Sequence, residues 1–457
     1  MEHIRLYSEI QDDIQIQGKV SSFFDTFSIG KLLHRCGVRK RHGYGPRFLI
    51  EAIFILPFIG MNLYRGIVIN EECTVGKDAV YEILKGTTYN WRRLLLQLGV
   101  KLHSFFNRLT DEERESVLII DDSTYDRSRS KKVELLSRVK DHTTGQFVKG
   151  FRMLTICWSD GVSSLPLDFA LLSSAKKSNR FCESQKQLDK RCCAYRRRVE
   201  ATMKSTELLE PMLQRILSAG IQARYLLMDS WFGMPATIAL LSKHISVICM
   251  VKKTSKVHYG FEGQPLCVKT IYKRLRKRRG RAKILASAVV TIKDGQLARL
   301  VFVRDRRKKD WLVLLSTDIA LPESDIVRIY GKRWDIEVFF KMAKQHLKLV
   351  KEIQCRDFDA LIAHTTIVFM RYMFVAYNCR RETDHRTFGE LFYACCDELR
   401  DISFIESLYR VLTLAVKQLQ EMDTFCERTI QMFFATLIEA ALSSVGIAKS
   451  QLRVHET

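Results

Sequence analysis

The sequence predicts an α/β protein whose core is a mixed β-sheet covered by helices. Three observations favour this class. Short apolar runs typical of buried strands alternate with helical patterns between residues 117 and 252, and longer helical patterns lie on both sides of this core. Alternating apolar and polar residues in 253–310 indicate a β-rich insertion. With 457 residues, the chain is long enough for two or three domains.

Residues 1–112 form the first predicted region, which is mostly helical and to which we assign DNA binding. Its segment GKDAVYEILKGTTYNWRRLLLQL contains two helical patterns joined at Gly86-Thr87-Thr88, and Arg92 and Arg93 open the second pattern. Such a pair resembles a helix-turn-helix, which places basic residues on DNA, but helices also pair this way in ordinary cores. Both interpretations of the helix pair remain open.

The strands of the core begin in region 113–252, its first part. VLIIDD (117–122) predicts a buried strand that ends in two aspartates. It is followed by two more predicted strands, FRMLTICWS and SLPLDFALLS. A basic segment with Arg196, Arg197 and Arg198 comes next, and a helix near 204–218 leads to another buried strand, ARYLLMDSWF. A helix near 234–243 and the strand ISVICMV complete this part of the core.

The segment 253–310 interrupts the alternation of strands and helices. It contains the basic run KRLRKRRGRAK and then two alternating segments, ILASAVVTI and ARLVFVRD. Apolar strand character returns in WLVLLSTDIA, after which helices dominate. We therefore assign 311–380 to the second part of the core and 381–457 to a helical C-terminal region.

The charge balance of the chain indicates a polyanionic partner. Lys and Arg number 74 against 51 Asp and Glu, a net charge of +23 that is spread along most of the sequence. Nucleic acid is the leading candidate for such a partner.

The 13 cysteines predict buried thiols in a reducing cytoplasm and not a set of disulfides. They are scattered, often inside apolar runs, and the polar N-terminus does not resemble a signal peptide. The absence of a CxxC pair argues against a zinc ribbon. Cys395-Cys396 with His385 is a weak metal motif, for which a structural role is the stronger interpretation.

Two long apolar stretches are interpreted as core helices and not as membrane spans. LIEAIFILPFIGMNLY contains Glu51 and Pro57, and ALIAHTTIVFMRYMFVAYNC contains His364 and Arg371. Charged residues and proline inside such stretches are unfavourable in a bilayer. We therefore expect no membrane association.

Two of the predicted strands end in an aspartate, Asp122 and Asp229, and each is followed by small hydroxyl residues. A single aspartate at such a place is usually a turn or cap residue. Two of them in a basic protein fit ligands of Mg²⁺, which prefers carboxylate oxygens and keeps other positions for water and phosphate.

The segment YGKRWDIEVFFKMAK (330–344) predicts one helix with a narrow charged stripe. At about 100° per residue, Arg333, Glu337, Lys341 and Lys344 share one face, and apolar residues cover most of the remainder. Such a helix is buried on its apolar faces, so the stripe is expected to line a cleft. The alternative is an exposed face with charge pairs at i,i+4 spacing.

Carboxylates beside cations favour phosphodiester chemistry on nucleic acid. Two metal ions held by three carboxylates can activate a water or a 3′-hydroxyl and stabilise the leaving oxygen. Neighbouring Arg and Lys side chains would hold the phosphates of the DNA strand.

Tyr330, Arg333, Glu337 and Lys344 reproduce the Y-x2-R-x3-E-x6-K signature, and in these residues the chain resembles bacterial insertion-sequence DDE transposases of the insertion-sequence-four type. The strands ending in IIDDST and LLMDSWF are similar to the two Asp motifs of that family, so the resemblance covers roughly 115–380. It implies an RNase H-like catalytic core, with 253–310 at the place of the family's β-rich insertion.

The resemblance also implies site residues. Asp122, Asp229 and Glu337 would form the catalytic triad and bind two Mg²⁺ ions, for which Mn²⁺ can substitute. Asp121 is the rival for the first position, because either acid of the pair could face the metal. The implied DNA contacts are made by Tyr330, Arg333, Lys341 and Lys344, with Trp334 and Trp311 receiving or stabilising a flipped base. For Trp311 a role as a core aromatic is equally open.

The activity implied by the resemblance is cut-and-paste transposition. Water first cuts one strand at each element end, the freed 3′-hydroxyl forms a hairpin, and the reopened 3′ ends join target DNA. The implied partners are the terminal inverted repeats, target DNA and a second copy of the chain, in a bacterial cytoplasm at the nucleoid. A metal-dependent nuclease without strand transfer and an inactive DNA-binding repressor remain the alternatives.

Overall fold

The computed structural model describes residues 18–380, apart from 41, 59–60, 71–74, 111–113, 142–143, 185, 280–281 and 306–309. The predicted C-terminal region 381–457 lies outside the described residues, together with the dimerisation assigned to it. The same holds for the weak metal motif of Cys395, Cys396 and His385.

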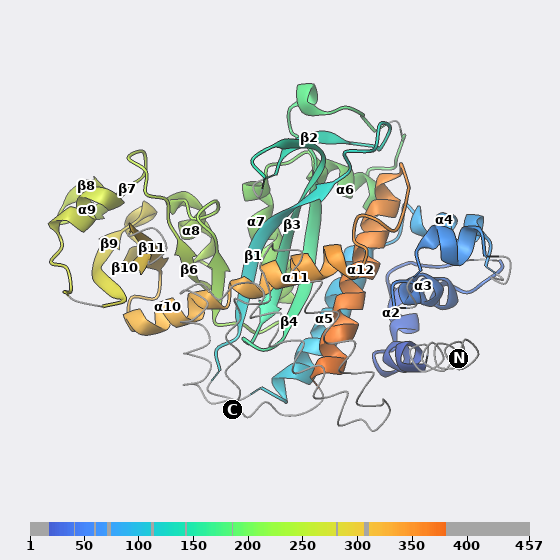
Figure 1. Cartoon of the computed structure of the whole chain (residues 1–457), viewed down its shortest axis with the longest axis horizontal. Helices are drawn as coiled ribbons and strands as arrows, with labels where there is room; N and C mark the ends of the chain where they lie inside the picture. The colour runs from blue at the N-terminus through green and yellow to red at the C-terminus, as the bar shows by residue number, and fades with distance from the viewer. Residues whose placement is uncertain are drawn as a thin grey trace, which may run out of the picture.

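A mixed sheet of eleven strands forms the centre of the molecule (Figure 1). Its middle strand β1 (Val117–Asp126) pairs in parallel with β5 (Tyr225–Met228) and antiparallel with β3 (Phe147–Ser159). Next to these lie β6, parallel to β5, and β4 and β2, both antiparallel to β3; their bounds are Ser246–Met250, Ser164–Leu172 and Ser137–Lys140. The predicted strands of the core are therefore present, and the α/β prediction is confirmed.

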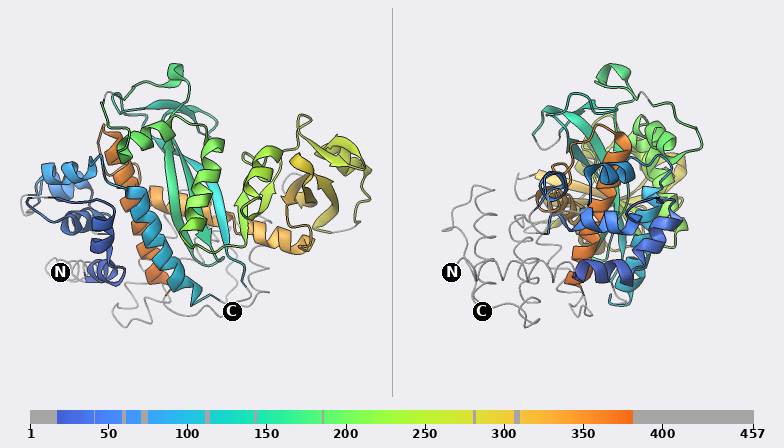
Figure 2. Two further views of the ribbon diagram at one scale, coloured as in Figure 1. Left: turned by 180° about the vertical axis from the view of Figure 1, so that it is seen from behind. Right: turned by 90° about the vertical axis from the view of Figure 1, so that its right-hand side faces the viewer.

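Helices cover both faces of the central strands. The long helix α11 (Trp334–Gln345) crosses one face, and α7 (Ser205–Ser218) lies on the other (Figures 1 and 2). Val117 to Ile120 of β1 consequently have no exposed surface. A strand buried on both faces is a continuous apolar run without alternation, which is the pattern of VLII in the sequence.

The remaining strands extend the sheet beyond β6 and form the lobe on the left of Figure 1. They follow in the order β11 (Asp310–Ser316), β10 (Leu297–Asp305), β9 (Ile284–Thr291), β7 (His258–Phe261) and β8 (Gln264–Cys267). Helix α9 (Val268–Arg274) packs on β7 and β8, and α10 (Glu323–Gly331) contacts β9, β10, β11 and β6. β11 pairs antiparallel with β6 of the core on one side and with β10 on the other. The strands of the predicted insertion, β7 to β10, therefore extend the core sheet beyond β11.

Several of the other helices pack against the long helix α12. The N-terminal helices stand at the right of Figure 1: α2 (Ile29–Arg35), α3 (Pro46–Ile55), α4 (Lys77–Leu84) and the π-helix η1 (Tyr64–Val68). Helices α5 (Trp91–Asn107) and α12 (Phe358–Cys379) pack against each other and on β4. The remaining helical elements are α6 (Cys193–Ala201), α8 (Pro235–Leu241) and two 3₁₀ turns, η2 (Lys177–Asn179) and η3 (Lys293–Gly295).

The predicted helix pair consists of α4 and α5, and α5 is a core helix. Leu94, Leu98 and Leu102 are fully buried. The guanidinium of Arg92 pairs with Asp168 of β4 at 3.1 Å and with Glu200 of α6. The structure therefore supports the packing interpretation for this pair, because Arg92 points into the protein. DNA binding by the rest of 1–112 stays a prediction.

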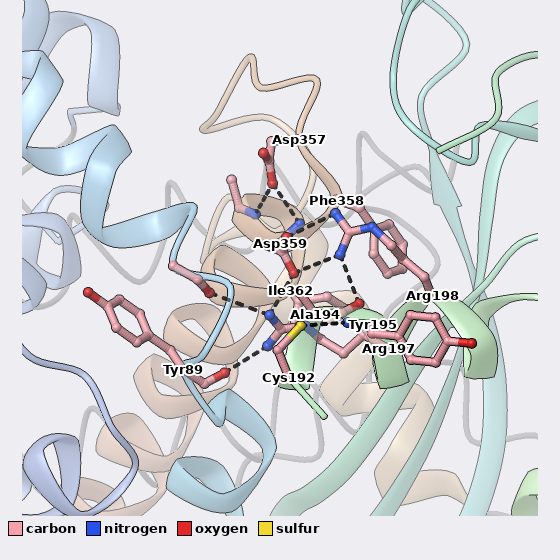
Figure 3. A network of polar contacts seen from close by, with 12 residues as sticks. Tyr89, Cys192, Ala194, Tyr195, Arg197, Arg198, Asp357, Phe358, Asp359 and Ile362 are labelled. Carbon is pink, nitrogen blue, oxygen red and sulfur yellow. Dashed lines mark hydrogen bonds and ion pairs between the residues drawn. The ribbon is translucent and has the colours of Figure 1, made fainter. Parts of the chain in front are cut away.

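The basic segment around residue 197 is also turned inward (Figure 3). Arg197 and Arg198 pair with Asp359, which is fully buried at the start of α12, and Arg198 also binds Glu134 at 2.7 Å. Arg197 donates to the carbonyl oxygen of Tyr89 at 2.8 Å. These contacts tie α6, α12 and the turn before α5 together, so two of the three arginines in this segment stabilise the fold.

α12 is long and apolar enough to cross a membrane, yet 78% of its apolar window is buried inside the protein. The interpretation of this stretch as a core helix is supported. The cysteines in the described ranges are all free thiols. Cys157 and Cys249 are buried within strands as predicted, but Cys379 is exposed and four others are partly exposed, so the prediction of buried thiols holds for only part of them.

One buried charge on α12 holds three segments together. Arg371 forms a two-pronged ion pair with Glu352 at 2.7 and 2.9 Å, and both side chains are fully buried. Its Nε donates to the carbonyl oxygen of Phe54 at 2.9 Å, and His364 lies 2.5 Å from the Glu352 carboxylate.

Replacing Glu352 with glutamine is expected to lower the free energy of unfolding by about 3–5 kcal/mol, because the Arg371 charge would remain buried without its counterion. Urea unfolding of both proteins measures the difference. Glu183→Gln is the matched control, since that carboxylate is 53% exposed beside Arg180, and we expect a loss of no more than about 1 kcal/mol there.

The same ion pair predicts acid sensitivity. Burial alone would raise the pKa of Glu352, but Arg371 and His364 lower it to about 2, from an ordinary value of 4.5. A carboxyl with a lowered folded-state pKa stabilises the protein above its unfolded pKa, and this contribution is lost as the pH falls. Wild-type stability should therefore decline between about pH 4.5 and 2, and Glu352→Gln should show a flatter dependence in the same range.

Candidate active site

The sheet brings two aspartates to one edge. In the parallel pair of β1 and β5, the last matched residues are Ile120 and Met228. Asp121 and Asp229 directly follow them, so the two residues lie side by side where the strands' pairing ends. Parallel strands present their carboxyl ends at the same edge, which is where ligands of open α/β sheets bind.

Asp121 and Asp122 point to opposite faces of the sheet, because side chains alternate along a strand. Asp121 accepts a hydrogen bond from Arg333 Nη1 at 3.0 Å, on the face that α11 covers. Asp122 accepts two from Arg152 Nη1 at 2.8 and 2.9 Å. The structure thus corrects the placement expected for Asp122: it brings Asp121, and not Asp122, to Arg333 and Glu337.

Arg333 joins two of the carboxylates. Its Nη1 binds Asp121, and its Nη2 donates to Glu337 Oε1. Only 17% of the Arg333 side chain, 17% of the Asp121 side chain and 34% of the Glu337 side chain are exposed. The guanidinium therefore lies in a half-buried position between the end of β1 and the first turn of α11.

The predicted single helix is in fact two helices. α10 ends at Gly331 and α11 begins at Trp334, with Lys332 and Arg333 in a tight turn between them. Hydrogen bonds of the i to i+3 type close this turn: Arg333 N to Tyr330 O at 3.0 Å and Asp335 N to Lys332 O at 3.1 Å. Lys332 and Arg333 keep right-handed helical backbone angles, so the charged stripe survives the break and Arg333 stays above Glu337.

The electrostatics of the cluster centre on Asp121. Burial raises the pKa of Asp121 to about 7, the nearby Asp229 adds to the rise, and Arg333 opposes it. The pKa of Arg333 lies above its usual value, since Tyr330, Glu337 and Asp121 outweigh the effect of burial. The cluster thus combines a half-buried carboxyl with a raised pKa and one arginine that contacts both Asp121 and Glu337.

Lys344 and Tyr330, the other two residues of the signature, lie close to this cluster, and Lys341 and Trp334 belong to the same helix α11 as Lys344. Lys344 Nζ donates to Ser123 Oγ at 2.6 Å, and Ser123 is on the Asp121 side of β1. Burial lowers the pKa of both Lys344 and Lys341. Tyr330 is buried, and its hydroxyl has no hydrogen-bond partner within the described part of the chain. Trp334, half-buried, opens α11.

Comparison with protein families gives this geometry its context. The family described as DDE superfamily endonuclease matches residues 69–307, which is more than half of the chain. The chain belongs to this family. An RNase H-like fold is that of the DDE superfamily, so the predicted fold class is confirmed. No curated protein matches the chain.

Membership in the DDE family supports an endonuclease that acts on DNA. The matched segment includes Asp121, Asp122 and Asp229 but ends before Tyr330 and Glu337. The finer assignment, to transposases of the insertion-sequence-four type with their signature, therefore remains a proposal.

Trp311 of this DDE endonuclease lies near the start of β11, in the extended part of the sheet. Its ring packs on Tyr272, at a centroid distance of 4.5 Å, and on Phe302 at 5.4 Å. Lys253 Nζ sits 4.8 Å from the ring centroid. This packing favours the core interpretation of Trp311, while its role at a flipped base stays a prediction.

Two residues near the carboxylates were not predicted from the sequence. Arg152 of β3 holds Asp122, and Trp231 follows Asp229 by two residues and is 48% exposed. The backbone N–H of Trp231 donates to Asp229 Oδ1 at 2.9 Å. The exposed tryptophan in LLMDSWF was a visible signal, whereas the pairing of Arg152 with Asp122 spans 30 residues and depends on strand register.

Divalent metal ions are typical of DDE endonucleases, and the donors present fit one in chemistry. Among the described residues, no group of three or more His, Cys, Asp or Glu is already arranged around a metal position. Asp121 and Asp229 nevertheless supply hard oxygen donors at one edge of the sheet, which is the donor type that a divalent cation such as Mg²⁺ prefers. Glu337 reaches them only through the Arg333 guanidinium, so a site with three carboxylates requires Arg333 to shift.

Proposed function

We propose that this DDE endonuclease is an insertion-sequence transposase whose reacting carboxylates are Asp121, Asp229 and Glu337. The observation that carries the proposal is the chain of contacts from Asp121 through Arg333 to Glu337, at the sheet edge where Asp229 also lies. Its residues come from β1, from the end of β5 and from the turn and helix that follow the inserted strands.

Each residue of the cluster has a distinct task in the proposed reaction. Asp121, Asp229 and Glu337 would hold Mg²⁺ or Mn²⁺, which supplies an activated water or 3′-hydroxyl and stabilises the leaving oxygen. Arg333 holds Asp121 and Glu337 in place until the metal binds, when it shifts away from them. Lys341 and Lys344 bind phosphates of the DNA end, because an ammonium with a pKa lowered by burial gains most from a phosphate partner.

The buried Tyr330 hydroxyl is a hydrogen-bond donor near the cluster, and we propose that it donates to a DNA phosphate. The proposed reaction is cut-and-paste transposition through a hairpin, with the terminal inverted repeats and target DNA as substrates. We also propose a homodimer as the active form and the bacterial cytoplasm as its location. The net charge of +23 supports a DNA partner.

The test uses the full chain with a labelled duplex that carries the element's own end, together with a target plasmid and Mg²⁺. A transposase yields a hairpin and then a joined product. Cleavage without joining would favour a stand-alone nuclease, and binding without cleavage would favour a repressor. Glu337→Gln is the control for the carboxylates: every product should vanish while DNA binding persists.

A further inference from the structure

A second basic feature lies on the face of the sheet opposite the carboxylate cluster. A groove of about 520 Å³ is lined by β2, by Arg152 of β3, by the end of β4, by the start of α7 and by the loops after β5 and β6. No acidic residue is among the described residues that line it. Its cations are Arg138, Lys140, Arg152, Lys204 and Lys252. Such a charge pattern fits an anionic ligand with several phosphates.

The groove also presents an exposed aromatic ring. Trp231 is 48% exposed and Met234 beside it 39% exposed. Lys252 Nζ lies 4.4 Å from the centroid of the Trp231 ring, and the Arg152 guanidinium lies 5.9 Å from it. An aromatic platform beside cations is the arrangement with which proteins bind unpaired nucleotides, because the base stacks while the cations meet the backbone.

The platform and its cations are held in place. The backbone at Trp231 is held by the bond from its N–H to Asp229. Arg152 is held by both oxygens of Asp122, and its Nη2 donates to the carbonyl oxygen of Lys140 at 3.1 Å. Asp122 is only 8% exposed, so this carboxylate positions a groove arginine and does not face the cluster around Asp121.

We propose that this groove binds an unpaired stretch of the DNA substrate, with one base on Trp231 and neighbouring phosphates on Arg152 and Lys252. This inference rests on the proposed action on DNA. A groove of about 520 Å³ falls in the size range of sites for small ligands, which includes a ligand of nucleotide size. Trp231 follows Asp229 by two residues, and its backbone N–H binds that carboxylate, so the groove begins next to the end of β5.

The test is binding of labelled oligothymidylate by the full chain in EDTA, followed by fluorescence anisotropy, with a duplex of equal length beside it. Trp231→Ala is expected to weaken single-strand binding by about 5- to 150-fold, the loss of one stacked base, and to leave duplex binding within about twofold. Trp231→Phe should restore most of the affinity, since the smaller ring still stacks. Phe181→Ala, at a 51% exposed aromatic outside the groove and outside region 1–112, should bind like wild type.

The cation contacts have a separate readout. Lys252→Ala should make the dependence of log K on log salt for the single strand shallower by about 0.7, the value for one phosphate contact. Unchanged single-strand affinity in Trp231→Ala would overturn the inference, as would an equal loss for single strand and duplex. Since these measurements need no metal and no cleavage, a protein that binds single strands through Trp231 but never cuts DNA would refute the proposed transposase and leave the groove assignment standing.

Discussion

Replacing Asp121 with asparagine is expected to reduce Mg²⁺-dependent DNA cleavage by at least about 10³-fold, whereas Asp122→Asn should retain cleavage within about tenfold. The two residues are neighbours on β1, yet only Asp121 lies on the side of Arg333 and Glu337. Loss of a carboxylate that holds the ion removes several kcal/mol of stabilisation from the transition state. A gel assay of end cleavage under single-turnover conditions measures both variants.

Asp122→Asn is also expected to lower the stability of the protein, and this effect must be separated from any effect on the rate of cleavage. The variant weakens a largely buried ion pair with Arg152, so we expect the free energy of unfolding to fall by about 1–3 kcal/mol. Thermal unfolding of both variants identifies a temperature at which each is fully folded, and cleavage is compared there. Abolished cleavage in Asp122→Asn with activity preserved in Asp121→Asn would reverse the assignment.

The sequence predicted that an acid of the pair Asp121-Asp122 lies at the sheet edge, but it could not predict which of the two faces the cluster. The pattern VLIIDD predicted a buried strand that carries acid to a sheet edge, and β1 has this form. Because side chains alternate along a strand, one of the two acids had to face the cluster and the other had to face away. Which one does so depends on the helices that pack on each face, α11 and α7, and no local feature of the six residues contains that information.

The charged stripe on 330–344 was predicted from periodicity, and its members do lie together although the helix is broken. The turn at Lys332-Arg333 was not predicted, because the sequence contains no proline there and the backbone stays helical in its angles. The role of Arg92 was left open for a related reason. A basic residue at the start of a helix looks the same in sequence whether it meets DNA or, as here, Asp168 and Glu200 of distant elements.

The inserted strands and the long apolar helices were predictable because their signals are local. Alternation in ILASAVVTI and ARLVFVRD corresponds to β9 and β10, and the polar residues inside the apolar stretch of α12 indicated a protein core. In contrast, the groove around Trp231 combines residues from β2, β3, the start of α7 and the loops after β5 and β6. Its basic character is a property of the folded surface and not of any one segment.

Replacing Arg333 with glutamine should make the protein's stability depend more strongly on divalent metal ions. Without the guanidinium, Asp121 faces Asp229 and Glu337 with no opposing charge in this cluster, and we expect the free energy of unfolding in EDTA to fall by about 1–3 kcal/mol. A cation at the carboxylates supplies the missing positive charge and competes with no arginine. Mn²⁺ should therefore raise the melting temperature of Arg333→Gln by more than it raises that of wild type. The comparison is made at pH 8, because Asp121, with its pKa of about 7, is largely ionised there in the wild-type protein.

Arg152→Gln is the matched control for this experiment, because it removes the same kind of pair from a carboxylate, Asp122, on the opposite face. We expect it to lose a similar amount of stability in EDTA and to gain no more from Mn²⁺ than wild type does. If Mn²⁺ stabilises Arg152→Gln more than Arg333→Gln, the ion binds on the Asp122 side. Equal gains in both variants and wild type would instead mean that neither arginine neighbours the ion, and Asp121, Asp229 and Glu337 would lose their proposed role as its ligands.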